Sequence, residues 1–166
     1  MTVCTTIDSP LGELLLVGEE SVTAKGGTAL ASLSMPGQKH GVVAQDGWVE
    51  DADAFAEITS QLRAYFDGTL TDFDIEFVTS GSDFQQRVWK ALETIPYGTT
   101  LSYGEIAARI GASRAAVRAV GTAIGANPLL VVRPCHRVIG ANGALTGYAA
   151  GLERKRQLVD LEHVPV

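Results

Sequence analysis

The sequence lacks the features of a membrane protein and of a secreted, disulfide-stabilised one. None of its apolar runs approaches the roughly 20 residues that a membrane-spanning helix needs. The first residues contain no basic segment followed by an apolar one. Only two cysteines are present, Cys4 and Cys135, and hydrophobic residues make up 46% of the chain, enough to bury a core without a disulfide. We therefore expect a cytoplasmic protein with no membrane partner, in which each thiol has its own role.

The sequence is also poor in metal ligands. Cys4, Cys135, His40, His136 and His163 show no paired spacing of the zinc-binding type. No internal repeat or low-complexity tract is evident in the 166 residues. We expect no bound metal, and either one compact domain or two small halves.

Basic residues are scarce in the first half of the chain and common in the second. Residues 1–80 carry three basic and thirteen acidic side chains, a net charge of −10, whereas residues 81–166 carry ten and six, a net charge of +4. In segment 106–156, eight cations stand against a single acid, Glu153. On charge alone, this segment is either a surface that binds a polyanion or a set of solvated cations. The cations are Arg109, Arg114, Arg118, Arg133, Arg137, Arg154, Lys155 and Arg156.

The first half predicts a small β-sheet followed by a helix. Two short apolar runs on either side of the turn-forming segment 9–12 are typical of a hairpin. Residues 19–50 predict one or two further strands, with a loop at 36–41. Between Asp51 and Gly68, acids come first and apolar residues then recur with helical spacing, which predicts a helix.

The second half predicts a helix-turn-helix motif. One helix opens at Ser82. Ser102 and Glu105 form a capping box that starts a second helix, and Gly111 ends it. Ser113 is positioned to cap a third helix. Two short helices joined by a glycine-containing turn have helix-turn-helix spacing, although many helical hairpins share this spacing and bind nothing.

Small residues dominate the third predicted helix and leave a flat surface that carries Arg114 and Arg118. Such a surface can approach a duplex closely. The apolar run 129–132 predicts a buried strand that leads to Cys135, and a final helix is predicted at 151–162.

Cys135 is the best candidate nucleophile. It follows the predicted buried strand and a proline, with His136 next to it and an arginine on each side. Positive surroundings favour the thiolate, which is the reactive form. An arbitrary Cys-His pair is more often a packed cysteine beside an unrelated histidine. Cys4 has no basic neighbour and lies in a predicted strand, so we expect it to be structural.

The segment Pro134 to Gly140 resembles the active-site signature of the O6-alkylguanine-DNA alkyltransferases, also called methylated-DNA–protein-cysteine methyltransferases. Further segments are similar to segments of that family in order and approximate spacing: 84–89, 95–98, 102–107, 118–121 and 127–128. The resemblance implies an α+β fold: an N-terminal ribonuclease H-like α/β domain with a small sheet and a helix, residues 1–80, and a C-terminal helical domain with the helix-turn-helix, residues 81–166.

The resemblance implies a DNA repair protein that is consumed by its own reaction. Such proteins flip O6-alkylguanine, and also O4-alkylthymine, out of duplex DNA and transfer the alkyl group irreversibly to a cysteine, here Cys135. The second helix of the motif enters the minor groove, where Arg118 fills the gap left by the flipped base. No cofactor is implied; the protein is expected to be a monomer in solution, with cooperative assembly on DNA left open. The residues implied to contact DNA are Arg114, Ala116, Arg118, Gly121 and Thr122.

The resemblance also implies roles for the remaining site residues. The thiol proton leaves through a relay of His136, a water molecule and Glu162, and the departing guanine is protonated by Tyr103. Lys155 assists that protonation, and Asn127 fixes the turn behind the cysteine. The residues implied to line the base pocket are Val138, Tyr148, Ala149, Ala150 and Gly151.

Two alternatives from other functional classes compete with this interpretation. A DNA-binding protein that senses lesions without enzymatic activity would share the scaffold but lack the cysteine, whereas this chain has Cys135, His136 and Glu162. A Cys-His hydrolase would act repeatedly on acyl substrates, but no oxyanion site is evident in the sequence.

Overall fold

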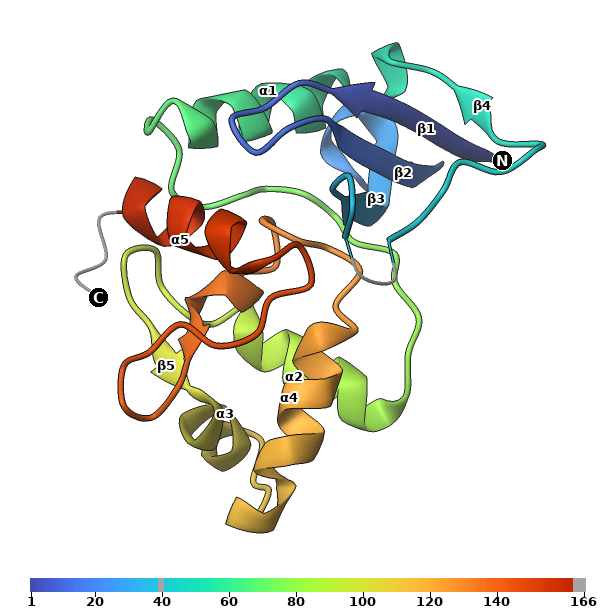
Figure 1. Ribbon diagram of the computed structural model, residues 1–166. Coiled ribbons are helices and arrows are strands. Elements are labelled where there is room, and N and C mark those ends of the chain that lie inside the picture. Colours follow the sequence, from blue (N-terminus) through green and yellow to red (C-terminus); the bar gives the residue numbers. More distant parts are fainter. Residues whose placement is uncertain (39–40, 163–166) are drawn as a thin grey trace. The chain divides into compact units, whose positions relative to one another are not determined.

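The computed structural model describes residues 1–38 and 41–162 (Figure 1). The chain forms two compact units, Met1–Thr79 and Ser80–Val166. The loop predicted at 36–41 lies partly outside the described residues. No helix in the part of the chain that the structure describes is long and apolar enough to cross a membrane.

The first unit is built on a four-stranded sheet with the strand order β3-β2-β1-β4. β1 (Thr2–Ile7) and β2 (Leu14–Glu20) form the predicted antiparallel hairpin, which closes through hydrogen bonds between Ser9 and Gly12. β3 (Thr28–Ser34) pairs antiparallel with β2, and the short β4 (Val49–Glu50) pairs in parallel with β1. The sheet is therefore mixed, and the expected further strands are confirmed.

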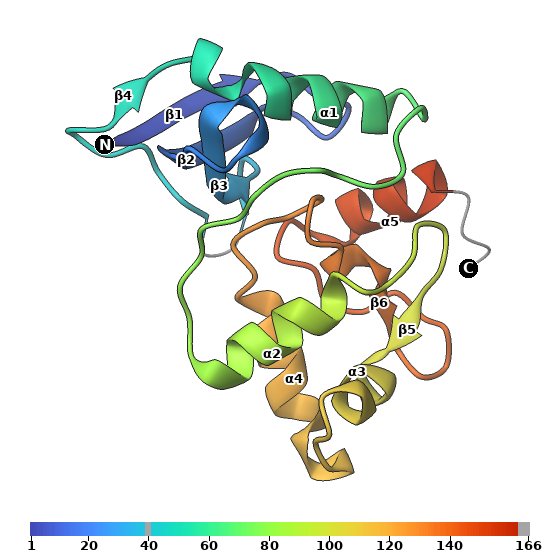
Figure 2. The same ribbon diagram turned by 180° about the vertical axis from the view of Figure 1, so that it is seen from behind.

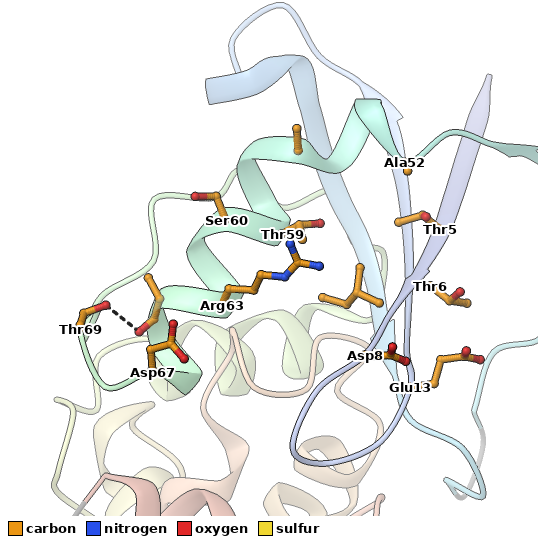
Figure 3. A pocket seen from close by; sticks show the side chains of 13 residues that line it. Thr5, Thr6, Asp8, Glu13, Ala52, Thr59, Ser60, Arg63, Asp67 and Thr69 are labelled. Carbon is orange, nitrogen blue, oxygen red and sulfur yellow. Dashed lines mark hydrogen bonds between the residues drawn. The ribbon is translucent and has the colours of Figure 1, made fainter.

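Helix α1 (Ala56–Phe66) lies alongside this sheet (Figures 1 and 2). A 3₁₀ turn, Asp53–Phe55, precedes it, and Gly68 follows it with a φ of +81° that glycine adopts at little cost. Cys4 is buried in β1, as expected of a structural cysteine. Between β1 and α1 the surface has a polar groove of about 830 Å³ (Figure 3). None of the predicted site residues lines it.

The described part of the second unit, residues 80–162, contains four α-helices and a two-stranded sheet. The helices are α2 (Asp83–Leu92), α3 (Tyr103–Arg109), α4 (Val117–Gly125) and α5 (Leu152–Leu161). β5 (Leu101–Ser102) pairs in parallel with β6 (Val138–Ile139), a pairing that local sequence patterns did not predict. Helices α2, α3 and α4 pack against one another around buried apolar side chains. The predicted helices are confirmed, including the Ser102–Glu105 capping box.

The start of the third predicted helix differs from expectation. A 3₁₀ turn, Arg114–Ala116, comes first, and α4 begins only at Val117. The side chain of Ser113 makes no capping hydrogen bond, so the predicted cap is wrong. In a capped helix the Ala116 N–H would donate to the Ser113 hydroxyl. Here it donates to the backbone carbonyl of Ser113 at 2.9 Å.

The buried strand predicted at 129–132 is also wrong, although the segment is buried. The chain makes a tight turn here: the Arg133 N–H donates to the Leu129 carbonyl at 3.1 Å, and Val131 has a φ of +69°. The Asn127 side chain accepts from the Leu129 N–H and donates to the Leu129 and Arg133 carbonyls. A polar side chain therefore satisfies the backbone groups that a strand would have paired. A buried valine with positive φ is strained by about 1–3 kcal/mol, so the surrounding packing must impose this conformation.

Candidate active site

Cys135 lies at the first position of a 3₁₀ turn, Cys135–Arg137, between the tight turn at 129–132 and β6. The residue is only 4% exposed. Its N–H donates to the Arg133 carbonyl at 2.7 Å, so the backbone at the nucleophile is held by the preceding turn.

Burial controls the protonation of this thiol. It raises the pKa of Cys135 to about 11, while a hydrogen bond from the Asn127 side chain and the positive charges of Lys155 and Arg133 act in the opposite direction. Desolvation of the charged form outweighs these contributions. The positive surroundings therefore favour the thiolate, as expected, but burial opposes it more strongly, so the thiol of the resting protein is protonated at neutral pH. A base must remove the proton before the sulfur can react.

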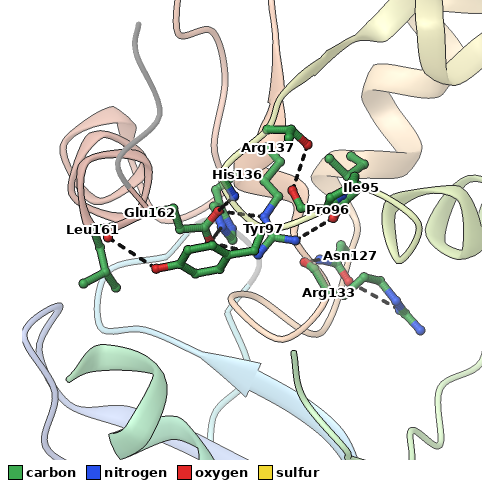
Figure 4. A network of polar contacts seen from close by, with 11 residues as sticks. Ile95, Pro96, Tyr97, Asn127, Arg133, His136, Arg137, Leu161 and Glu162 are labelled. Atoms are coloured by element: carbon green, nitrogen blue, oxygen red, sulfur yellow. Dashed lines mark hydrogen bonds and ion pairs between the residues drawn. The ribbon is translucent and has the colours of Figure 1, made fainter. Parts of the chain in front are cut away.

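A buried polar network follows Cys135 in the chain (Figure 4). His136 Nε2 lies 2.7 Å from Oε2 of Glu162, the residue at the C-terminal end of α5. Arg137 donates from Nε to Oε1 of the same carboxylate at 2.8 Å and from Nη2 to Oε2 at 3.0 Å. A third bond, from Arg137 Nη1 to the Ile95 carbonyl at 2.6 Å, anchors the guanidinium. The structure thus brings together His136 and Glu162, which are 26 positions apart in the sequence.

This network defines the tautomer of His136. Because the Glu162 carboxylate is an acceptor, the proton in the shared hydrogen bond belongs to Nε2, and Nδ1 keeps its lone pair. Nδ1 is buried and has no hydrogen-bond partner among the described residues. Burial lowers the pKa of His136, while the bond to Glu162 opposes this shift. The imidazole is therefore neutral at neutral pH and able to accept a proton at Nδ1.

Tyr103 and Lys155 converge on the loop that precedes α5. The Tyr103 hydroxyl donates to the Thr146 carbonyl at 3.0 Å, and Lys155 Nζ donates to the Thr146 and Gly147 carbonyls at 2.6 and 3.1 Å. Lys155 is fully buried, and burial lowers its pKa to about 8, although the Cys135 thiolate raises it. A cation with this pKa gives up a proton more readily than an ordinary lysine.

The structure also locates the predicted pocket residues. Val138 is buried in β6. Residues 148–150 are half-buried in the loop that leads into α5, and Gly151 is exposed at the N-cap of that helix. The loop 146–151 therefore carries the predicted pocket residues together with the carbonyls that Tyr103 and Lys155 bind.

The candidate DNA-contacting residues occupy one short segment. Arg114 and Ala116 belong to the 3₁₀ turn, and Arg118, Gly121 and Thr122 belong to α4. The two arginines and the threonine are exposed, whereas Ala116 and Gly121 are half-buried. A Cβ added at Gly121 would lie 3.8 Å from the ring of Tyr103, so α4 passes close to the start of α3.

Three of the eight cations in the basic segment do not lie at the surface, because each is buried against a polar partner. Arg133 pairs with Glu93, Arg137 with Glu162, and Lys155 binds loop carbonyls. The polyanion-binding surface is therefore smaller than segment 106–156 suggested. In the sequence, Arg133 and Arg137 stand out only by their positive charge. The burial of these two arginines cannot be predicted from the sequence, because their carboxylate partners lie 40 and 25 positions away in the chain.

Fold and site together define a helix-turn-helix protein with a buried thiol beside a histidine–carboxylate pair. Comparison with known families agrees with this class. Residues 2–79 match the family described as 6-O-methylguanine DNA methyltransferase, ribonuclease-like domain. Residues 83–164 match the family described as 6-O-methylguanine DNA methyltransferase, DNA binding domain.

Individual relatives cover nearly the whole chain. Methylated-DNA–protein-cysteine methyltransferase of Mycolicibacterium paratuberculosis is 55% identical over 157 residues, 95% of this chain and 90% of the relative. That of Methanosarcina acetivorans is 46% identical, covering 93% and 94%. A crystal structure of Mycobacterium tuberculosis OGT in complex with DNA superposes with a TM-score of 0.86 at 52% identity, covering 96% and 92%.

The chain belongs to the methylated-DNA–protein-cysteine methyltransferases, a family of DNA repair proteins. The resemblance drawn from the sequence is thereby confirmed. So are the α+β fold, with its ribonuclease-like and DNA-binding domains, and the transferase activity.

Proposed function

We propose that this methyltransferase takes the alkyl group of O6-alkylguanine on Cys135 and is consumed in doing so. The observation that carries this assignment is the buried thiol followed in the chain by a neutral imidazole, which Glu162 holds through Nε2 and whose Nδ1 lone pair has no partner among the described residues. The thiolate attacks the alkyl carbon, the sulfur–carbon bond forms and the carbon–O6 bond breaks, with its electron pair passing to guanine. The thioether product resists water, so each chain reacts once.

His136 acts as the base in this proposal. Its Nδ1 takes the thiol proton by way of a bridging water, and the resulting imidazolium is stabilised by the Glu162 carboxylate at Nε2. Arg137 holds the carboxylate with two further hydrogen bonds, which keeps it aimed at the imidazole. The relay lowers the barrier that the high thiol pKa would otherwise impose.

Tyr103 and Lys155 protonate the leaving group in this proposal. The departing guanine anion must gain a proton, and the two side chains present a hydroxyl from α3 and a cation from α5 beside the same loop. Tyr103 donates the proton, and Lys155, with its lowered pKa, replaces it. Residues 148–151 and Val138 form the walls of the base pocket.

DNA binds through the 3₁₀ turn and α4. The small residues of α4 permit close approach to the minor groove, and Arg118 enters the stack where the target base has been flipped out. The M. tuberculosis relative was crystallised in complex with DNA, which supports DNA as the partner of this chain. O4-alkylthymine is a second substrate in this proposal. In this proposal the protein is a cytoplasmic monomer in solution, and copies can assemble cooperatively on DNA.

The test is to mix the protein with a slight excess of duplex carrying one O6-methylguanine and to measure intact and peptide masses. The expected result is one methyl group per chain, located on the Cys135 peptide, and none in Cys135→Ser. A duplex with an unmodified guanine is the matched substrate control. A protein that shifts the methylated duplex in a gel but stays unmodified would contradict the proposal and favour the lesion-sensing alternative.

A further inference from the structure

A buried guanidinium lies two residues before the proposed acceptor thiol. The Arg133 side chain is 4% exposed, and its Nε donates to Glu93 Oε2 at 3.1 Å. Its Cζ also lies 5.1 Å from the centre of the Trp89 ring. Glu93 follows α2 as its C-cap and is 38% exposed. The reaction described above uses neither member of this ion pair. An ion pair with one exposed member contributes little to stability, so we examined its contacts with the adjoining site.

The guanidinium helps to fix the amide of Asn127. Asn127 Oδ1 accepts from the Leu129 N–H at 3.0 Å and from Arg133 Nη1 at 3.4 Å. Asn127 Nδ2 donates to the Leu129 and Arg133 carbonyls, both at 3.2 Å. A flipped amide would set its oxygen against two carbonyls and its N–H groups against two donors. Arg133 therefore favours the one orientation of Asn127, and the Asn127 side chain in turn lowers the pKa of the Cys135 thiol, which favours the thiolate.

The charge of Arg133 also acts on the thiol. The other charged groups near Cys135 are Lys155 on α5 and the buried set of Arg137 and Glu162 around His136. Arg137 and Glu162 compensate each other at close range. Arg133 is buried, whereas its partner Glu93 reaches water and is screened there, so the positive end of this pair is felt more strongly inside the site.

We propose that Glu93 and Arg133 are positioning residues for Cys135: the ion pair fixes the Asn127 amide, which binds the same Arg133 carbonyl as the Cys135 N–H, and its positive end stabilises the thiolate when the proton leaves. The inference rests on the proposed role of Cys135 as the acceptor. In this inference two sets of residues have different roles. His136 and Glu162 remove the proton, and the Glu93–Arg133–Asn127 chain stabilises the charge that remains on sulfur.

The test compares the whole protein with Arg133→Met, which removes the charge, and Arg133→Lys, which keeps it. Arg63→Met is the matched control, because Arg63 is an exposed arginine of the first unit. The rate at which iodoacetamide modifies Cys135 is followed by peptide mass after brief jumps to pH values between about 7 and 12. Thermal unfolding of each variant is recorded in parallel.

In the wild type the rate should rise with pH to a midpoint near the thiol pKa of about 11. In Arg133→Met we expect the midpoint to rise by roughly one pH unit, which lowers the rate at neutral pH about tenfold. Arg133→Lys should regain most of that loss, and Arg63→Met should match the wild type. A lower rate with an unchanged midpoint, or a lysine variant no better than the methionine variant, would overturn the inference and leave Arg133 a purely structural role.

A second variant keeps the inference testable if Arg133→Met does not fold. Glu93→Gln leaves the guanidinium charged but removes the carboxylate that holds it, and the Glu93 charge itself is screened by water, so the midpoint should rise; an unchanged or lower midpoint would overturn the role of the ion pair. Failure of the proposed function looks different. In that case the wild type itself would transfer no methyl group from a methylated duplex to Cys135, whatever residue stands at position 133.

Discussion

Burial determines the protonation state of the titratable side chains around the thiol. Desolvation raises the pKa of Cys135 to about 11, lowers that of Lys155 to about 8 and lowers that of His136 from its ordinary value. Each shift favours the neutral form. In the proposed reaction the proton starts on a thiol that holds it tightly and passes to an imidazole that accepts it weakly, so little reactive thiolate is present in the resting protein.

The pKa of His136 makes stability depend on pH. Because burial lowers this pKa, the unfolded chain binds a proton at the imidazole more readily than the folded chain does. The stability that the neutral His136 imidazole contributes is fully present above its unfolded-state pKa of about 6.5. It is lost as the pH falls below that pKa. Urea unfolding between about pH 5 and 8 should show a smaller loss of stability in His136→Gln than in the wild type. Equal losses in the two proteins would mean that the imidazole is not held neutral.

At the scale of elements, the two helices of the motif begin differently although a serine precedes each. Ser102 accepts from the Glu105 N–H at 3.1 Å, and the Glu105 side chain accepts from the Ser102 N–H at the same distance. The side chain of Ser113 makes no such bond. The capping box fixes the first turn of α3, which carries Tyr103, whereas a 3₁₀ turn leads into α4.

Serine-to-alanine substitutions should separate these two starts. Ser102→Ala removes a cap and should lower the free energy of unfolding by about 1 kcal/mol. Ser113→Ala is the matched control and should change it by less than about 0.5 kcal/mol. Urea denaturation measures both, and methyl transfer by Ser102→Ala shows whether a loosened first turn also disturbs Tyr103. Similar losses in the two variants would refute the difference in capping.

At the scale of the whole molecule, charge is divided between the two halves of the chain. The net charge of −6 would repel DNA, yet residues 81–166 carry +4 and present exposed arginines on the helix-turn-helix. Attraction to phosphates therefore depends on how the charge is distributed and not on its sum.

This distribution predicts how salt affects binding. The affinity for a duplex should fall as salt increases, despite the negative net charge, because bound cations release counterions from the DNA. Arg114→Gln should reduce the slope of log affinity against log salt by about 0.9, the value for one phosphate contact. Arg63→Gln removes the same charge from the first unit and should leave the slope unchanged. A gel-shift titration at several salt concentrations measures both slopes, and an unchanged slope in Arg114→Gln would remove Arg114 from the interface.

Local patterns in the sequence predicted much of this fold. The hairpin around Ser9–Gly12, the helical spacing before Gly68 and the Ser102–Glu105 capping box each depend on residues close together in the chain, and each is present in the structure. The apolar run 129–132 predicts a strand where the structure has a tight turn, because hydrophobicity indicates burial but not backbone direction. There the conformation is set by hydrogen bonds that the Asn127 side chain donates and accepts.

The sequence by itself determined the α+β class, the family and the choice of Cys135 as the candidate nucleophile, since these follow from motifs whose residues lie side by side in the chain. Only the tertiary structure decided which cations are buried and how strongly the thiol holds its proton. Those properties depend on carboxylates and loops brought in from distant positions, Glu93 to Arg133 and Glu162 to Arg137, and on a desolvation that exists only in the folded chain.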